Sequence, residues 1–268
     1  MNIAIRSRLN ADLQDLIYEN DYYIQSIFIP KTKTTKKLRN EEWNTIRSFE
    51  KHFQFIFAKQ IVTISINKGT YMTKRKVSKI SPDIVLNFKY YDKYDGRERT
   101  MKLNIMNSNL LSTKLNYFIP KEARSESWMD EDGKLIYSME ELKKDIEDVK
   151  DENKLLYHFL LNGSRWGLSG DIISELYYTM GYHKDQKLKD VDIERLYKNI
   201  KKLLVSNFLL GGKNPELDGE MGEFFRNYKI FGKKNSKIER INYRGNSLFF
   251  IKKNNNDILT KENHECSI

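Results

Sequence analysis

Residues Asp218 to Phe250 carry the strongest fold signal in the chain and read DGEMGEFFRNYKIFGKKNSKIERINYRGNSLFF. Two short alternating runs, Lys237–Asn242 and Ser247–Lys252, flank the turn sequence Arg244-Gly245-Asn246. β-Branched and aromatic residues on either side of a turn with Asn and Gly predict a β-hairpin. From Lys229 to Lys253 the chain has eight Lys or Arg residues and one acid. A basic hairpin suits a nucleic-acid groove, although a solvated hairpin in a lysine-rich protein would carry the same charges.

The size and composition indicate a globular protein with a polyanionic partner. The chain has 268 residues, 39% of them hydrophobic, which is enough for a substantial core in one or two domains. Its net charge of +10 at pH 7 favours a polyanion. It has no apolar run of the ~18 residues that a membrane helix needs, and its N-terminus is not that of a signal peptide. The single cysteine, Cys266, is consistent with a reducing intracellular compartment, cytoplasm or nucleus.

The hydrophobic pattern changes along the chain and predicts an α+β fold. Apolar residues at helical spacing predict an amphipathic helix over Ile3–Tyr18. Short strand-like runs, with a hairpin turn at Tyr94-Asp95-Gly96, predict an antiparallel β-sandwich after it. Four apolar stripes between residues 138 and 204 then predict helices. The strand-like runs are Tyr23–Ile29, Phe49–Phe57, Ile61–Ile66, Ile84–Tyr90, Met101–Ile105 and Leu115–Phe118.

These changes divide the chain into five predicted parts. Residues 1–119 are the N-terminal helix and the sandwich, and residues 120–137 are a charged linker. Residues 138–212 are a helical domain, and residues 213–253 are the basic hairpin. Residues 254–268 are an Asn-rich tail that we expect to be disordered.

The opening stretch resembles the C-terminal finger region of the formamidopyrimidine-DNA glycosylase/endonuclease VIII family. There, a D-G-x-x-G-x-F segment runs into V-Y-G-R and then into a β-hairpin finger. Here Asp218-Gly219, Gly222 and Phe224 match the first part, and Ile230–Lys233 stands in place of V-Y-G-R. Most members hold the finger with four cysteines on zinc, which needs four N or S ligands. With one cysteine and four scattered histidines, the chain resembles the zincless-finger branch, and we expect no metal and no other cofactor.

The resemblance continues through the helical part and weakens towards the N-terminus. Leu160–Ile172, LLNGSRWGLSGDI, resembles the helix-two-turns-helix signature of the family, and Glu175 and Gly181 fit the pattern that follows it. Glu50–Phe53 resembles the family's G-K-x-L strand start. The resemblance implies a sandwich, a helix-two-turns-helix domain and a zincless β-hairpin finger, and a function in base-excision repair of duplex DNA.

The resemblance also implies a chemistry whose usual residues are missing here. Family members flip a damaged base out of the duplex. They attack its sugar with the amine of an N-terminal proline, beside a glutamate that acts as general acid and base. This chain begins Met1-Asn2-Ile3, without that motif. The remaining candidate nucleophiles are the Met1 amine and Lys51, which stands where the family keeps a phosphate-contacting or catalytic lysine.

Three other family positions differ as well. Asp171 stands where an asparagine donates to a DNA phosphate, and an ionised carboxylate does not donate and repels the phosphate. Asn246 stands in place of the finger arginine, with Arg244 as the candidate substitute. The loop that fills the void left by the flipped base is Met106–Leu111, which has no arginine. The candidate intercalating residues are Leu110, Leu111 and Met72, although a lone Met is more often core packing.

Three functions stay open on the sequence. The leading one is a monomeric protein that binds duplex DNA, damaged or abasic, with absent or altered catalysis, because a wrong start codon would explain one lost site and not four. The second is an active DNA glycosylase/AP lyase for oxidised bases whose N-terminal nucleophile is missing from this chain or replaced. The third is a protein-interaction module on the same fold.

The candidate DNA-binding residues lie in several regions of the chain. They are Lys51, Gly170, Asp171, Lys233, Lys234, Arg244 and Asn246, with one basic loop at Lys31, Lys33, Lys36, Lys37 and Arg39 and another at Lys74, Arg75, Lys76 and Lys79. Either loop could equally be a solvated surface without a partner.

Overall fold

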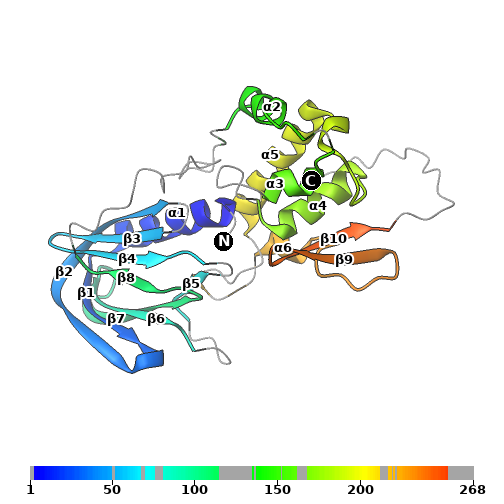
Figure 1. The fold of residues 1–268 in the computed structure, drawn as a ribbon. Helices are drawn as coiled ribbons and strands as arrows, with labels where there is room; N and C mark the ends of the chain where they lie inside the picture. The colour runs from blue at the N-terminus through cyan, green and yellow to red at the C-terminus, as the bar shows by residue number, and fades with distance from the viewer. Residues whose placement is uncertain are drawn as a thin grey trace.

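The computed structural model shows a β-sandwich beside a helical part that carries a small β-hairpin (Figure 1). It describes residues 3–49, 52–67, 70–75, 81–114, 135, 137–151, 153–161, 168–211, 217–218, 220 and 222–252, without the side chains of residues 3–5, 39 and 49. Along these residues, helix α1 (Ile3–Glu19) is followed by strands β1 to β8, helices α2 to α6 and the hairpin strands β9 and β10. The predicted α+β fold with an antiparallel sandwich is confirmed.

The sandwich is one antiparallel sheet folded over on itself. Its strands are β1 (Tyr22–Ile29), β2 (Thr34–Phe49), β3 (His52–Phe57), β4 (Ile61–Ser65), β5 (Tyr71–Thr73), β6 (Ile84–Asp92), β7 (Arg97–Met106) and β8 (Leu110–Ser112), in the order β5-β7-β6-β1-β2-β3-β4-β8. The long strand β2 belongs to both layers, because its first part pairs with β1 and its second part with β3. The register shifts between Trp43 and Thr45, and a bulge of this kind bends a strand.

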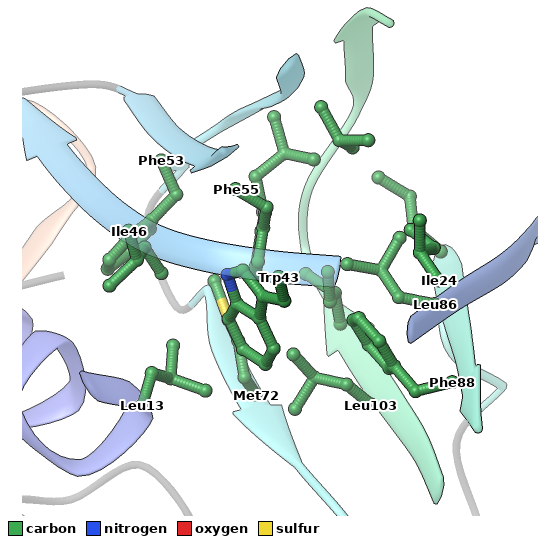
Figure 2. Close-up of a cluster of buried hydrophobic side chains, with 14 of the residues drawn as sticks. Leu13, Ile24, Trp43, Ile46, Phe53, Phe55, Met72, Leu86, Phe88 and Leu103 are labelled. Atoms are coloured by element: carbon green, nitrogen blue, oxygen red, sulfur yellow. The ribbon is translucent and has the colours of Figure 1, made fainter. Parts of the chain in front are cut away.

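Trp43 sits at this irregularity and organises the core between the layers (Figure 2). Its side chain is 1% exposed, and its ring stacks on Phe88 at 5.0 Å between centroids and contacts Phe55 at 5.5 Å. Leu13 of α1 belongs to the same cluster. Burial of large apolar side chains of this kind is the main favourable term in folding. One aromatic cluster that both layers share therefore holds the folded sheet together.

Met72 lies in the same core and not on the surface (Figure 2). Its side chain is 0% exposed, so it is out of reach of DNA bases. The prediction that Met72 intercalates is wrong. Its flexible thioether fills space between large side chains, which is the commoner use of methionine.

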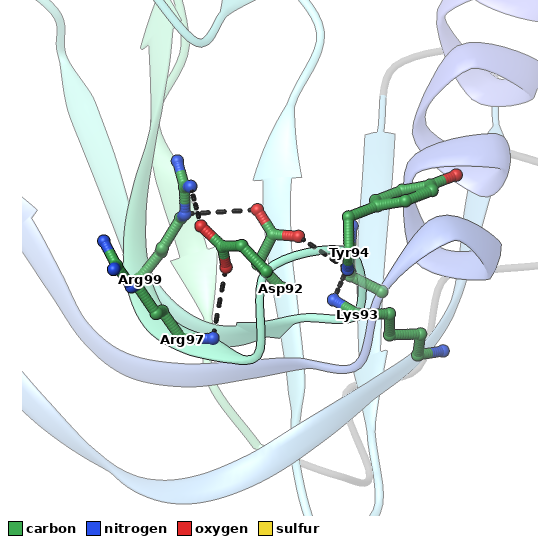
Figure 3. Close-up of polar contacts among 7 residues, drawn as sticks. Asp92, Lys93, Tyr94, Arg97 and Arg99 are labelled. Carbon is green, nitrogen blue, oxygen red and sulfur yellow. Dashed lines mark hydrogen bonds and ion pairs between the residues drawn. The ribbon is translucent and has the colours of Figure 1, made fainter.

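The turn between β6 and β7 is fixed by its own carboxylates (Figure 3). Asp92 accepts the backbone N–H of Tyr94 at 3.0 Å, and its carboxylate lies 3.1 Å from the Arg99 guanidinium. Asp95 accepts the N–H of Arg97 at 3.1 Å. The hydrogen bond from Arg99 lowers the pKa of the Asp95 carboxyl. The hairpin turn predicted here from the sequence is confirmed.

The helical part has a second hydrophobic core. Its helices are α2 (Met139–Glu147), α3 (Leu156–Leu161), α4 (Gly170–Met180), α5 (Ile193–Leu210) and the single turn α6 (Glu223–Arg226). Local sequence signals set their ends. Ser138 and Glu141 form a reciprocal capping box on α2, Asp192 caps α5, and Gly181 ends α4 in a left-handed conformation. The helices predicted from the four apolar stripes are confirmed as α2 to α5.

Contacts of α1 and of Leu217 join the sandwich to the helical part. α1 packs on α5, and the Arg8 guanidinium donates to the Phe208 carbonyl at 2.8 Å. That carbonyl lies in the last turn of α5, where carbonyls lack helical partners and carry the negative end of the helix dipole. The Leu217 carbonyl accepts the Lys74 N–H at 2.7 Å and the Thr73 hydroxyl at 3.1 Å, beside β5. The exact limits of the five predicted parts stay a prediction.

The C-terminal hairpin consists of β9 (Ile238–Tyr243) and β10 (Asn246–Ile251) and packs against α4 (Figure 1). Tyr243 pairs with Asn246 across a two-residue turn. The turn residues Arg244 and Gly245 have φ of 47° and 72°, as a type I′ turn requires. Phe250 is fully buried in the helical core. The hairpin predicted from the sequence is confirmed, with each strand shifted by one residue.

Two features bring β10 close to α4. The hydroxyl of the fully buried Ser174 accepts the Phe249 N–H at 3.0 Å and donates to the Gly170 carbonyl at 2.6 Å. Gly170 lies so near the strand that an added Cβ would sit 2.4 Å from the Ser247 carbonyl oxygen. Glycine at the start of α4 therefore permits the close approach of helix and strand.

Some sequence predictions differ from the structure. Residues 36–39, predicted as part of a basic loop, lie within β2. This polar segment lacks a clear apolar alternation, but it pairs with β1, and tertiary pairing outweighs intrinsic strand preference. β5, β8 and α6 are too short to show a period, and the sequence pattern does not predict them. The predicted strand Leu115–Phe118 lies outside the described residues.

We expect Gly170→Ala to destabilise the protein by about 1–3 kcal/mol, because the new methyl group has to displace β10. Helix propensity alone would act in the opposite direction, by up to about 1 kcal/mol. Urea unfolding followed by circular dichroism measures the difference. Gly181→Ala is the control, since its added Cβ meets nothing within 4 Å and only its left-handed φ of +70° is unfavourable. A Gly170→Ala protein as stable as the wild type would contradict this tight docking.

Candidate nucleic-acid interface

The hairpin and the segment that leads into it present a basic surface. The exposed cations of this hairpin surface are Lys229, Lys233, Lys234, Lys237, Arg240, Arg244 and Lys252. Its acid, Glu239, is paired with Lys184 at 3.0 Å between ammonium and carboxylate. A half-exposed ion pair contributes little to stability, but it neutralises the charge that would oppose a polyanion. The hairpin surface therefore combines several cations with little negative charge.

Glu175 fixes the segment that leads into the hairpin. Its carboxylate is 4% exposed and accepts the backbone N–H groups of residues 229, 230 and 231 at 2.7, 3.0 and 2.8 Å. Hydrogen bonds to an ionised acceptor are about twice as strong as neutral ones, and a buried carboxylate is costly without them. Gly232 follows with φ of 74°, and Lys233 and Lys234 are exposed directly after it. The buried acid thus sets where these two lysines emerge.

Asp171 is buried below the hairpin surface, with 1% of its side chain exposed. Its Oδ2 accepts the Tyr228 hydroxyl at 2.9 Å, and that hydroxyl oxygen accepts from the Asn207 amide at 3.1 Å. Burial, followed by the negative charge of Asp171, raises the pKa of the Tyr228 hydroxyl, so the hydroxyl stays protonated and donates. The prediction that the Asp171 side chain faces a DNA phosphate is wrong, because its polar group points into this internal network.

Arg244 occupies the tip of the hairpin. Its left-handed backbone costs a non-glycine residue about 1–2 kcal/mol, and its guanidinium lies 5.6 Å from the centroid of the Tyr243 ring. Asn246, which the sequence resemblance aligns with the finger arginine, is half-buried and faces the start of α4. Arg244 is therefore the exposed cation at this end of the hairpin.

The loop between β7 and β8 is tied to the sandwich. Ser108 is 4% exposed, and its hydroxyl donates to the Ser65 carbonyl at 2.7 Å. Leu110 pairs with β4 and packs partly against the sandwich core, whereas Leu111 is 40% exposed. Of the two predicted wedges, which both lie in β8, Leu111 has the more exposed side chain.

The remaining predicted positions fall into three groups. Met1, Lys51, Lys76 and Lys79 lie outside the described residues. Lys31, Lys33, Lys36, Lys37, Lys74 and Arg75 are exposed on the sandwich, and the side chain of Arg39 is not described.

Among the described residues, no cluster of three or more His, Cys, Asp or Glu could hold a metal ion. None of the helices described has the length and apolar character needed to cross a membrane.

Sequence reasoning missed two features of this region. Glu175 matches a family pattern, but its role depends on N–H groups from a distant segment that only the fold brings to it. The available signal was an acid within the apolar stripe of α4. The second feature is the stacking of His158 on Tyr243, at 4.3 Å between ring centroids and 19° between planes. No local sequence pattern at His158 or Tyr243 predicts this contact.

We expect Glu175→Gln to destabilise the protein by about 2–3 kcal/mol, because an amide loses the charge and turns N–H groups towards backbone N–H donors. Thermal and urea unfolding measure the loss. Glu147→Gln on α2 is the matched control, since its exposed carboxylate lies 3.9 Å from the Lys143 ammonium and such pairs contribute about 0–1 kcal/mol. Equal effects of the two substitutions would show that the three backbone hydrogen bonds do not anchor the hairpin.

Comparison with known proteins finds its matches among solved structures. No protein-family model matches the chain, and no curated protein matches its sequence. The structure of MutM (Fpg) from Thermus thermophilus is 12% identical, with a TM-score of 0.65 over 93% of this chain and 97% of that one. Lactococcus lactis Fpg (MutM) in complex with DNA containing N7-benzyl-Fapy-dG is 15% identical, with a TM-score of 0.65 over the same shares.

A third structure, Lactococcus lactis Fpg in complex with DNA containing an abasic site, is 14% identical, with a TM-score of 0.61 over 94% of this chain and 98% of that one. These likenesses run through the sandwich, the helical part and the hairpin, since they cover almost all of both chains. The chain therefore has the fold of the Fpg DNA glycosylases, as the resemblance in its sequence implied.

Proposed function

We propose that this protein binds duplex DNA, damaged or abasic, as a monomer, with absent or altered glycosylase activity. The observation that carries the proposal is the hairpin surface: its cations are exposed, and its one acid is paired with Lys184. Lys and Arg contacts to phosphates dominate the affinity of proteins for DNA. Two of the similar structures are complexes with DNA, which supports the choice of polyanion.

Catalysis is the part of the family function that the residues support least. The Asp171 carboxylate accepts the Tyr228 hydroxyl inside the protein and does not donate a hydrogen bond to a phosphate. The loop Met106–Leu111 has no arginine, and its buried Ser108 holds it to the sandwich. Leu111 remains as a wedge that could enter a disturbed base stack. Together these residues favour binding to distorted DNA over excision of a base.

Two other functions remain as alternatives. An active DNA glycosylase/AP lyase would need a nucleophilic amine, for which Lys51 and the Met1 amine are the candidates. A protein-interaction module would use the hairpin surface for an acidic protein partner. Salt-dependent binding to duplex DNA separates the second alternative from the proposal, and covalent trapping separates the first.

We expect binding to duplex DNA to weaken steeply with salt. If about four to six phosphates are contacted, the logarithm of the association constant falls against the logarithm of salt concentration with a slope of about −4 to −5. The double substitution Lys233→Ala/Lys234→Ala should reduce the steepness of that slope by about 2, one for each phosphate contact. Fluorescence anisotropy with a labelled duplex measures both.

Lys143→Ala on α2 is the control for total charge, because Lys143 is exposed and belongs to a different surface. It should leave the slope close to that of the wild type. Absence of binding at about 50 mM salt, or a flat salt response, would favour the protein-interaction alternative.

We expect little or no covalent DNA under borohydride on duplexes with an abasic site, an oxidised purine or an oxidised pyrimidine. Trapping needs an uncharged amine at the sugar, and a lysine of ordinary pKa, about 10.4, is almost fully charged near pH 7. Binding to the abasic duplex should persist and should weaken in Arg244→Ala. Efficient trapping that disappears in Lys51→Ala would establish an active enzyme with a lysine nucleophile. Efficient trapping that survives Lys51→Ala would point to the Met1 amine.

A further inference from the structure

The hairpin tip rests on a group of aromatic rings from α3. The His158 imidazole stacks on the Tyr243 ring with 4.3 Å between centroids and 19° between planes. Tyr157 meets both rings edge-on, at 4.4 Å from His158 and 5.4 Å from Tyr243. The Arg244 guanidinium lies 5.6 Å from the centroid of the same Tyr243 ring. A titratable imidazole and the exposed arginine of the tip therefore share one aromatic ring.

The charges around His158 come from the hairpin and from the segment just before α3. Arg244 of the hairpin and Lys154, just before α3, disfavour the protonated imidazole, whereas Asp151 favours it. Burial is the largest influence, and burial, Arg244 and Lys154 together lower the pKa of His158 below its ordinary value of 6.5. Without a ligand the imidazole is therefore neutral near pH 7.

A phosphate beside Arg244 would change this balance. The negative charge of the phosphate would offset the positive charges of Arg244 and Lys154, which together with burial lower the pKa of His158. Opposite charges within about 4–6 Å favour the ionised form of a group. The protonated imidazole is also a cation on the face of an aromatic ring, which is a favourable contact.

We propose that His158 is a proton-linked positioning residue of the hairpin tip, which takes up one proton from solvent when a DNA phosphate binds beside Arg244. This inference rests on the proposed DNA binding. The imidazole ring gains one N–H bond, and the proton comes from buffer. By linkage, the complex is favoured as the pH falls, because the bound state holds more protons than the free state.

The backbone conformation at the tip supports a functional role for Arg244. A type I′ turn favours Asn, Asp or Gly at both central positions, and arginine here adopts a φ of 47°. A residue held in an unfavourable conformation is a reason to look for a function at that site. The stack of Tyr243 on His158 limits where the arginine can go, since Tyr243 is the residue directly before it.

The test is DNA affinity as a function of pH at constant ionic strength. Wild type should bind a labelled duplex more tightly as the pH falls from about 8 to about 5, by up to about tenfold for each unit that the His158 pKa rises on binding. His158→Phe retains a stacking ring without a titratable group and should flatten this dependence. His183→Gln is the control, because His183 also contacts the hairpin, through the Ile251 carbonyl at 3.3 Å, and should retain it.

Calorimetry in buffers of different ionisation enthalpy should show proton uptake by the wild type and none by His158→Phe. Equal pH dependence in the wild type and His158→Phe would overturn the inference while leaving DNA binding intact. Absence of DNA binding at every pH would instead overturn the proposed function, and the inference with it. Should the variant fail to fold, NMR titration of the wild-type imidazole decides: an unchanged pKa on binding DNA overturns the inference, and a raised one supports it.

Discussion

A buried carboxylate decides where the basic hairpin stands. Glu175 of α4 accepts three consecutive backbone N–H groups at residues 229–231, just before the chain turns at Gly232 into the exposed lysines. Ser174 on the same helix accepts the Phe249 N–H from β10. One helix therefore binds both the entry to the hairpin and its second strand. A two-stranded hairpin has little core of its own, so these hydrogen bonds and the burial of Phe250 hold it on the helical part.

The same helix shows how a position associated with binding can be a structural one. The sequence resemblance aligns Asp171 with a DNA-contacting asparagine, yet its carboxylate accepts the Tyr228 hydroxyl in the interior. Tyr228 lies in the segment that Glu175 anchors, and Asn207 of α5 donates to it in turn. A buried network of this kind is favourable only when its members have partners. In place of a surface donor, the chain has a connection between α4, α5 and the hairpin.

The arrangement of the two halves rests on equally local chemistry. β2 passes through both layers of the sandwich, and Trp43 at its bulge is packed by rings from both. Arg8 of α1 binds a last-turn carbonyl of α5, where a cation complements the helix dipole. The Leu217 carbonyl, in the chain between α5 and the hairpin, accepts the Thr73 hydroxyl of β5. These contacts join the sandwich, which exposes Leu111, to the part of the chain that carries the hairpin and its exposed cations.

The sequence by itself determined the longer helices, most of the strands, the order sandwich–helices–hairpin and the turn at Arg244-Gly245. These features depend on periodicity, capping residues and left-handed turn positions that act over a few residues. It also supported the family resemblance that the fold bears out. It did not determine the first half of β2, which is polar and forms a strand because β1 pairs with it. Nor did it determine the orientation of side chains at motif positions. Asp171 and Met72 lie at positions that suggested contact with DNA, and both are buried. The partners of Glu175 and the stack of His158 on Tyr243 join segments far apart in the chain. Only the tertiary structure decides such contacts, because burial and hydrogen bonding depend on which distant groups the packing brings together.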